Sequence, residues 1–225
     1  MTISTPLARI PLLAEGLHGN RGWRVPLTSL PNLLTLSRIL VIPVVVATFY
    51  LHGDYARWFA CALFSAAGVT DWLDGHMARR WQQQSELGRF LDPIADKLLV
   101  AATLFMLTTF GRLSAGAVFP ALVILCREIL VSGLREYLAG LRVGVPVSRL
   151  AKWKTTIQMV AIGFLIVGDA GPRLIPVAAI GETLLWIAAL LTLVTGYDYL
   201  RAGLPHITRP PRAAAIARGK SGRPA

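Results

Sequence analysis

The sequence predicts an all-α integral membrane protein with six transmembrane helices. Of its 225 residues, 54% are hydrophobic and only 16% are charged, whereas a soluble domain carries about 25% charged residues. Apolar segments close to the roughly 20 residues that span a bilayer recur along the chain. The net charge of +11 does not indicate a nucleic-acid partner, because the basic residues stand at the ends of these segments.

The first three spans are expected at residues 33–52, 56–81 and 86–110. Cap and turn residues at 27–32 open the first span, and His52-Gly53-Asp54 separates it from the second. A short polar turn leads into the third span, which Pro93 interrupts and can bend.

The last three spans are expected at residues 114–140, 148–167 and 174–200. Gly111-Arg112, the Gly/Pro-rich stretch 143–146 and the turn 169–173 connect them. Residues 1–30 are then an N-terminal arm, which can include an interfacial helix. Residues 31–201 form the transmembrane domain, and residues 202–225 form a disordered basic tail.

Six spans place both termini on one side of the membrane. Of the 23 lysines and arginines, only Arg57, Arg112 and Arg173 fall on the other side, and Arg127 lies within a span. Positively charged residues concentrate in cytoplasmic loops. We therefore expect both termini on the cytoplasmic side.

Four aspartates stand in the cytoplasmic halves of the second and third spans. Asp71 and Asp74 are three residues apart and Asp92 and Asp96 are four apart, so each pair shares a helix face. At 1.5 Å per residue, the four carboxylates fall at two matched depths, about 10 and 15 Å from the cytoplasmic ends. Ionised carboxylates are costly in hydrocarbon unless they line a wet cavity or bind cations. Oxygen ligands favour Mg²⁺ or Mn²⁺, and two such ions suit phosphoryl transfer.

Three other interpretations of the aspartates fit the sequence less well. They can pair with the basic residues Arg79, Arg80, Arg89 and Lys97, but these lie mostly nearer the headgroups than the acids do. A cation transporter can use intramembrane acids as an ion path, yet no repeated halves typical of transporters are evident. An inactive scaffold is disfavoured by the complete set of acids.

The stretch from Asp71 to Asp96 resembles the signature of the CDP-alcohol phosphatidyltransferase family, D-x2-D-G-x2-A-R-x8-G-x3-D-x3-D. All eight fixed positions match without a change in spacing: Asp71, Asp74, Gly75, Ala78, Arg79, Gly88, Asp92 and Asp96. The six-span layout with a cytoplasmic site is also that of the family. The resemblance therefore implies the CDP-alcohol phosphatidyltransferase fold from about Leu30 to Leu200.

The resemblance also implies roles for the acids. Asp71, Asp74 and Asp92 would be ligands of two divalent ions, and Asp96 would be both ligand and general base. A carboxylate near a reacting hydroxyl can accept its proton as the oxygen attacks phosphorus. The leaving group would be CMP.

For the lipid substrate, the resemblance implies that Gly75 and Ala78 make room for the cytidine of CDP-diacylglycerol. Arg79 would contact the diphosphate, because a guanidinium suits phosphate oxygens. Polar residues at the start of the first span also resemble those near the nucleotide in the family: Asn32, Thr35 and Arg38. A helix cap with a snorkelling arginine is the alternative there.

A second polar stretch lies in the fourth and fifth spans. Arg127 and Glu128 are in mid-span, and Arg135 is eight residues further, on nearly the same helix face. One interpretation is an ion pair between Arg127 and Glu128, Glu136 or an aspartate. The other is a basic pocket for an anionic acceptor, which Lys152 and Lys154 would complete.

The segments REILVSGLREY (127–137) and KWKTTIQM (152–159) are similar to those of the bacterial phosphatidylglycerophosphate synthases within this family, with Ala151 in place of a usual glycine. This resemblance implies sn-glycerol 3-phosphate as acceptor, its phosphate held by Arg127, Arg135 and Lys152. It also implies a homodimer in the bacterial inner membrane. An inositol phosphate, or the phosphatidylglycerol used by cardiolipin synthases, stays open as an alternative acceptor.

Overall fold

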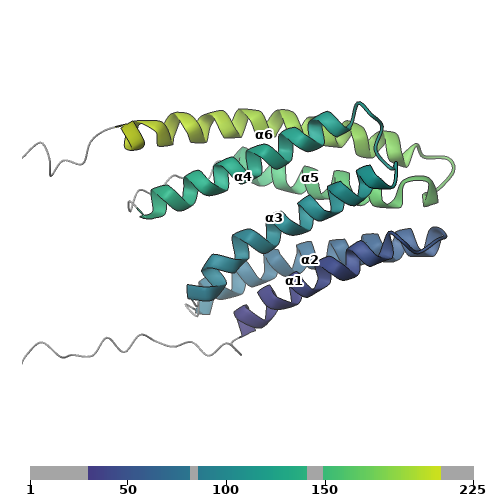
Figure 1. Ribbon diagram of the computed structural model, residues 1–225, viewed down its shortest axis with the longest axis horizontal. Coiled ribbons are helices and arrows are strands. Elements are labelled where there is room, and N and C mark those ends of the chain that lie inside the picture. The colour runs from purple at the N-terminus through teal and green to yellow at the C-terminus, as the bar shows by residue number, and fades with distance from the viewer. Residues whose placement is uncertain (1–29, 82–85, 141–148, 209–225) are drawn as a thin grey trace, which may run out of the picture.

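The chain is all-helical throughout the part that the computed structural model describes, residues 30–81, 86–140 and 149–208 (Figure 1). Within these ranges, the side chains of residues 30–35, 71–81, 86–90, 92, 149 and 206–208 are outside the description. The helices are α1 (Leu30–Thr48), α2 (Asp54–Trp81), α3 (Glu86–Thr109), α4 (Val118–Gly140), α5 (Arg149–Val167), the short 3-10 helix η1 (Gly168–Ala170) and α6 (Val177–Thr208). The predicted all-α architecture with six long helices is confirmed for the described residues.

The helix boundaries follow the predicted spans within a few residues, except at the end of α6. This helix continues to Thr208, whereas the sixth span was expected to end at Leu200. The reason lies in its packing, because Tyr199 is buried and a Cβ at Gly203 would lie 3.0 Å from the Leu138 side chain on α4. Residues 202–208, expected in the tail, are therefore helical, and residues 209–225 and 1–29 lie outside the described residues.

The helices form two groups that lie side by side (Figure 1). In one group α6 packs along α4 and α5, and in the other α1 packs against α2 and α3; contact between α2 and α5 joins them. Helix α1 begins and α6 ends at one end of the bundle, where α2 and α4 also end and α3 and α5 begin (Figure 1). We call this the signature end, since the helices that carry the Asp71–Asp96 stretch, α2 and α3, end and begin here.

Apolar side chains fill the bundle and also cover much of its outside. The buried core contains large residues from all six long helices, among them Val45, Phe64, Leu104, Leu107, Ile124, Ile162, Leu165 and Leu185. Exposed apolar residues include Trp58, Phe105, Phe119, Leu122, Ile129, Leu190 and Leu193. Soluble monomers rarely expose apolar surface on this scale, so the outer face suits hydrocarbon.

Two helical stretches are long and apolar enough to cross a membrane by length and composition, Leu150–Ala170 and Val177–Pro205. The apolar stretch Leu36–Thr48 of α1 is shorter. The helices α2, α3 and α4 carry charged residues in the halves that approach the signature end. These charges lower their hydropathy.

The opposite end of the bundle is closed by turns tied to neighbouring helices. Gly111 (φ 62°) takes the left-handed conformation that favours glycine. After it, the Ser114 backbone N–H and hydroxyl donate to the two carboxylate oxygens of Glu182 on α6, at 2.7 and 2.9 Å. Arg112 donates to the carbonyl of Ile166, and Arg57 donates to the carbonyl of Val167 and pairs with Asp169.

Replacing Glu182 should loosen this end. Glu182→Ala removes the acceptor of two hydrogen bonds, and we expect a loss of about 1 kcal/mol in the free energy of unfolding. Thermal unfolding of the purified protein in detergent would show a lower midpoint. An unchanged midpoint would mean that the α3-to-α4 turn does not depend on this contact.

Candidate functional site

The four aspartates lie on two continuous helices that meet at the signature end. Asp71 and Asp74 are in α2, which ends at Trp81, and Asp92 and Asp96 are in α3, which begins at Glu86. Both helices run unbroken through these positions, so the helical spacing assumed for each pair holds for the backbone. The grouping of the four carboxylates around two ions stays a prediction.

Asp96 is the one aspartate of the four whose side chain is described. It is partly buried, and its Oδ2 accepts from Lys97 Nζ at 3.3 Å. Among the described side chains, no group of three or more His, Cys, Asp or Glu lies close enough to hold a metal ion. The side chains of the other three aspartates are outside that search. The donor set itself, carboxylate oxygens alone, is the kind that hard divalent cations prefer.

The predicted nucleotide residues occupy α1 and the end of α2. Gly75, Ala78 and Arg79 continue the helix beyond Asp74. Asn32 and Thr35 lie in the first turns of α1. All five lie in the stretches whose side chains are outside the description. Arg38 is described and is only 3% exposed. A snorkelling arginine would reach the headgroups, so this burial favours a role inside the bundle.

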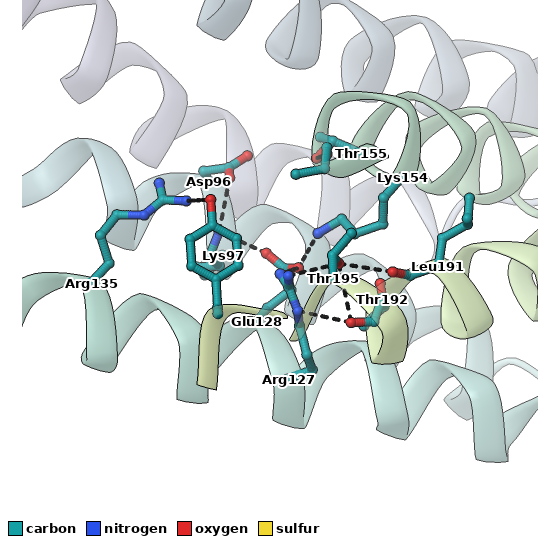
Figure 2. Close-up of polar contacts among 12 residues, drawn as sticks. Asp96, Lys97, Arg127, Glu128, Arg135, Lys154, Thr155, Leu191, Thr192 and Thr195 are labelled. Atoms are coloured by element: carbon teal, nitrogen blue, oxygen red, sulfur yellow. Dashed lines mark hydrogen bonds and ion pairs between the residues drawn. The ribbon is translucent and has the colours of Figure 1, made fainter. Parts of the chain in front are cut away.

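Glu128 on α4 is the centre of a buried ion cluster (Figure 2). Its Oε2 accepts from Lys97 Nζ of α3 at 2.8 Å. Its Oε1 accepts from Arg127 Nη1 at 3.1 Å and from Lys154 Nζ of α5. Glu128 is 9% exposed and Lys154 is 3% exposed. One carboxylate thus holds basic side chains from three helices.

Arg127 is held in addition by one face of α6. Its Nε donates to the Thr192 carbonyl at 3.1 Å and its Nη2 donates to Thr195 Oγ1 at 2.8 Å. Its guanidinium also lies 5.8 Å from the centre of the Tyr199 ring. With the Glu128 contact, three of the five N–H groups of the guanidinium are used. The ion pair that the sequence analysis offered as an alternative is therefore present.

Arg135 meets Arg127 on the same aromatic ring. Its Nη2 donates to the Tyr199 hydroxyl at 3.2 Å, and its guanidinium lies 5.5 Å from the ring centre. The spacing of eight residues thus brings the two arginines to one side of α4. Lys152 of α5 has an exposed side chain, whereas Lys154 of the same helix is buried at the cluster.

A cavity of about 570 Å³ lies between α3 and α4, and two residues of this cluster, Lys97 and Glu128, line it. Its polar lining comes from Asp96, Lys97, Glu128, Ser132, Glu136 and Gln158, and its apolar lining includes Ile94, Leu98, Leu125 and Ile129. Lys97 was predicted only as one of the basic residues with which the acids could pair. Its position directly after Asp96 was the signal that it lies at the site.

The chain matches a known protein family over most of its length. The family model for CDP-alcohol phosphatidyltransferases matches residues 28–194, which include the aspartates, the ion cluster and most of α6.

Several relatives of the chain bear one name, CDP-diacylglycerol–glycerol-3-phosphate 3-phosphatidyltransferase. The chain is 48% identical to the protein from Rickettsia felis over 174 residues, covering 77% of this chain and 94% of that one. It is 43% identical to the protein from Shigella flexneri serotype 5b over 176 residues, covering 77% and 94%. It is 40% identical to the protein from Cereibacter sphaeroides over 214 residues, covering 80% and 97%.

The close approach of Arg127 to α6 can be tested at Gly196. A Cβ there would lie 3.1 Å from Arg127 Cγ and 3.2 Å from Nε, and Arg127 is held by too many contacts to move aside at little cost. Overpacking of this kind costs about 1–3 kcal/mol, so Gly196→Ala should lower the thermal unfolding midpoint. Gly133→Ala is the matched control, because a Cβ at Gly133 meets nothing within 4 Å, and the alanine should keep or raise the midpoint. Equal midpoints for the two variants would contradict the predicted fit.

Proposed function

The chain belongs to the CDP-alcohol phosphatidyltransferase family, and from this we propose that it transfers the phosphatidyl group of CDP-diacylglycerol to sn-glycerol 3-phosphate. The products are phosphatidylglycerophosphate and CMP. The observation that carries the proposal is the 40–48% identity to relatives named for this reaction, over 77–80% of the chain.

The proposed metal ligands are Asp71, Asp74, Asp92 and Asp96, holding two Mg²⁺ or Mn²⁺ ions. When bound, such ions neutralise charge on the phosphate oxygens and so favour attack on phosphorus. Asp96 accepts the proton of the acceptor hydroxyl. The hydroxyl oxygen forms a bond to the phosphorus that carries the diacylglycerol, and the bond from that phosphorus to CMP breaks. The helical spacing of the aspartates on α2 and α3 supports this assignment.

The lipid substrate is bound along α1 and α2 in this proposal. Gly75 and Ala78 leave room for the cytidine, and Arg79 contacts the diphosphate. Asn32, Thr35 and Arg38 supply polar groups near the nucleotide. The burial of Arg38 inside the bundle supports its place in this group.

The acceptor phosphate is bound by basic side chains, for which Arg127, Arg135 and Lys152 are proposed. The shared contact of Arg127 and Arg135 with Tyr199 supports a common basic site. The exposure of Lys152 gives it the least support of the three. A neutral alcohol would not need this charge, whereas an inositol phosphate would, so the latter is the second candidate acceptor.

All six long helices cross the bacterial inner membrane in this proposal, with both termini and the active site on the cytoplasmic side. The even number of helices, the common end of both termini (Figure 1) and the strongly one-sided distribution of basic residues support this orientation. The proposed assembly is a homodimer, as the family resemblance implies.

The function is tested by incubating the purified protein with CDP-diacylglycerol and a panel of alcohols while CMP release is followed. We expect release with sn-glycerol 3-phosphate and Mg²⁺ or Mn²⁺, none after chelation, and recovery when metal is returned. Release only with an inositol phosphate would replace the acceptor. Full activity in excess chelator would refute the metal assignment.

The role of Asp96 is tested by Asp96→Asn, which keeps the size of the side chain but cannot accept the proton. We expect CMP release to fall by a factor of about 10² or more, with CDP-diacylglycerol still bound. Asp169→Asn is the matched control, because Asp169 lies at the opposite end of the bundle with its side chain 90% exposed. Turnover in Asp96→Asn equal to that of the control would rule out Asp96 as the base.

A further inference from the structure

The three cations around Glu128 differ in what else they face. Within the described part of the chain, Lys97 lines the cavity between α3 and α4, and Arg127 and Lys154 are not part of its lining. The side chain of Lys97 is 27% exposed, against 11% for Arg127 and 4% for Lys154. Lys97 is therefore the member of the cluster that a molecule in the cavity can reach.

Arg127 and Lys154 contact the other carboxylate oxygen of Glu128. Both donate to Oε1, and Arg127 is fixed further by Thr192 and Thr195 of α6. Lys97 alone of the three contacts Oε2. Because two cations already offset the Glu128 charge, Glu128 can orient the Lys97 ammonium without cancelling its attraction for an anion.

The position of Lys97 also limits the distance between the anionic group and the reacting hydroxyl of the acceptor. Its Nζ lies 3.3 Å from Asp96 Oδ2, the proposed base. An acceptor that places its anionic group on Lys97 and its hydroxyl on Asp96 must be short, with the two groups separated by a few bonds. A three-carbon alcohol phosphate meets this requirement. The apolar lining strengthens the attraction, since charges interact more strongly in a poorly polar surrounding.

We propose that Lys97 binds the phosphate of the acceptor in the cavity between α3 and α4 and that Glu128 positions Lys97 for this purpose. The inference rests on the proposed function and deepens it. Lys97 is then a binding residue at the cavity wall, and Glu128 is a positioning residue that acts through Lys97.

The test measures kcat and the KM of each substrate for the wild type, Lys97→Met, Lys97→Arg, Glu128→Gln and the double variant Lys97→Met with Glu128→Gln. We expect Lys97→Met to raise the KM for sn-glycerol 3-phosphate by about tenfold or more, the size of a lost charged hydrogen bond, with the KM for CDP-diacylglycerol unchanged. Lys97→Arg, which keeps the cation, should recover part of the loss. Glu128→Gln should raise the same KM.

The double variant separates positioning from a general structural effect. If Glu128 acts through Lys97, adding Glu128→Gln to Lys97→Met changes the acceptor KM no further. Effects that multiply would overturn the positioning role. Glu182→Gln is the matched control at the opposite end of the bundle and should leave both KM values unchanged.

Three other results would overturn the inference. They are an equal rise of both KM values in Lys97→Met, a fall in kcat alone, and no effect at all. If Glu128→Gln does not fold, as judged by its elution from a sizing column, the comparison of Lys97→Met with Lys97→Arg decides the binding role. A wild type that releases no CMP with sn-glycerol 3-phosphate refutes the proposed function and this inference together, whereas an active wild type with an unaffected Lys97→Met refutes the inference alone.

Discussion

The sharing of one buried carboxylate among several cations is the interaction on which the site depends. Glu128 contacts Lys97 of α3, Arg127 of its own helix and Lys154 of α5, and Arg127 extends the contact to α6. An unpaired charge in such surroundings costs several kcal/mol, so none of these helices can shift far without leaving a charge unmatched. The polar cluster therefore fixes the register of four helices that are otherwise joined by apolar packing.

Most of the fold could be predicted from the sequence because it follows from the lengths of apolar runs and the turns between them. Glycines at 53 and 111, expected in connections, have positive φ angles there. The end of α6 could not be predicted in this way. Basic, Gly and Pro residues follow Leu200 in the sequence, but contacts of Tyr199 and Gly203 with α4 keep the helix intact to Thr208. Tertiary packing decided this boundary, and local composition did not show it.

The candidate site was predictable to different extents in its two parts. The aspartate signature depends on spacing along two helices, and spacing is visible in a sequence. Which of Lys152 and Lys154 faces the interior depends on the rotation of α5 about its axis. Polar residues stand on several sides of the first half of α5, so its sequence carries no strong periodic signal of that rotation, and contact with α6 sets it. Lys97 stands next to Asp96 in the sequence, but its contact with Glu128 and its place in the cavity wall depend on how α3 packs against α4.

The hydrogen bonds at the end opposite the signature end determine how the bundle can deform. Ser114 is bound to Glu182, and Arg57 and Arg112 are bound to backbone carbonyls at the end of α5. With that end held, a change in the separation of α3 and α4 is a tilt about a fixed pivot. The displacement grows in proportion to the distance from the pivot, and Asp96 and Lys97 lie about halfway along α3, where Lys97 also pairs with Glu128 of α4. A tilt of this kind would displace the signature end, beyond that ion pair, more than the packed core near the pivot.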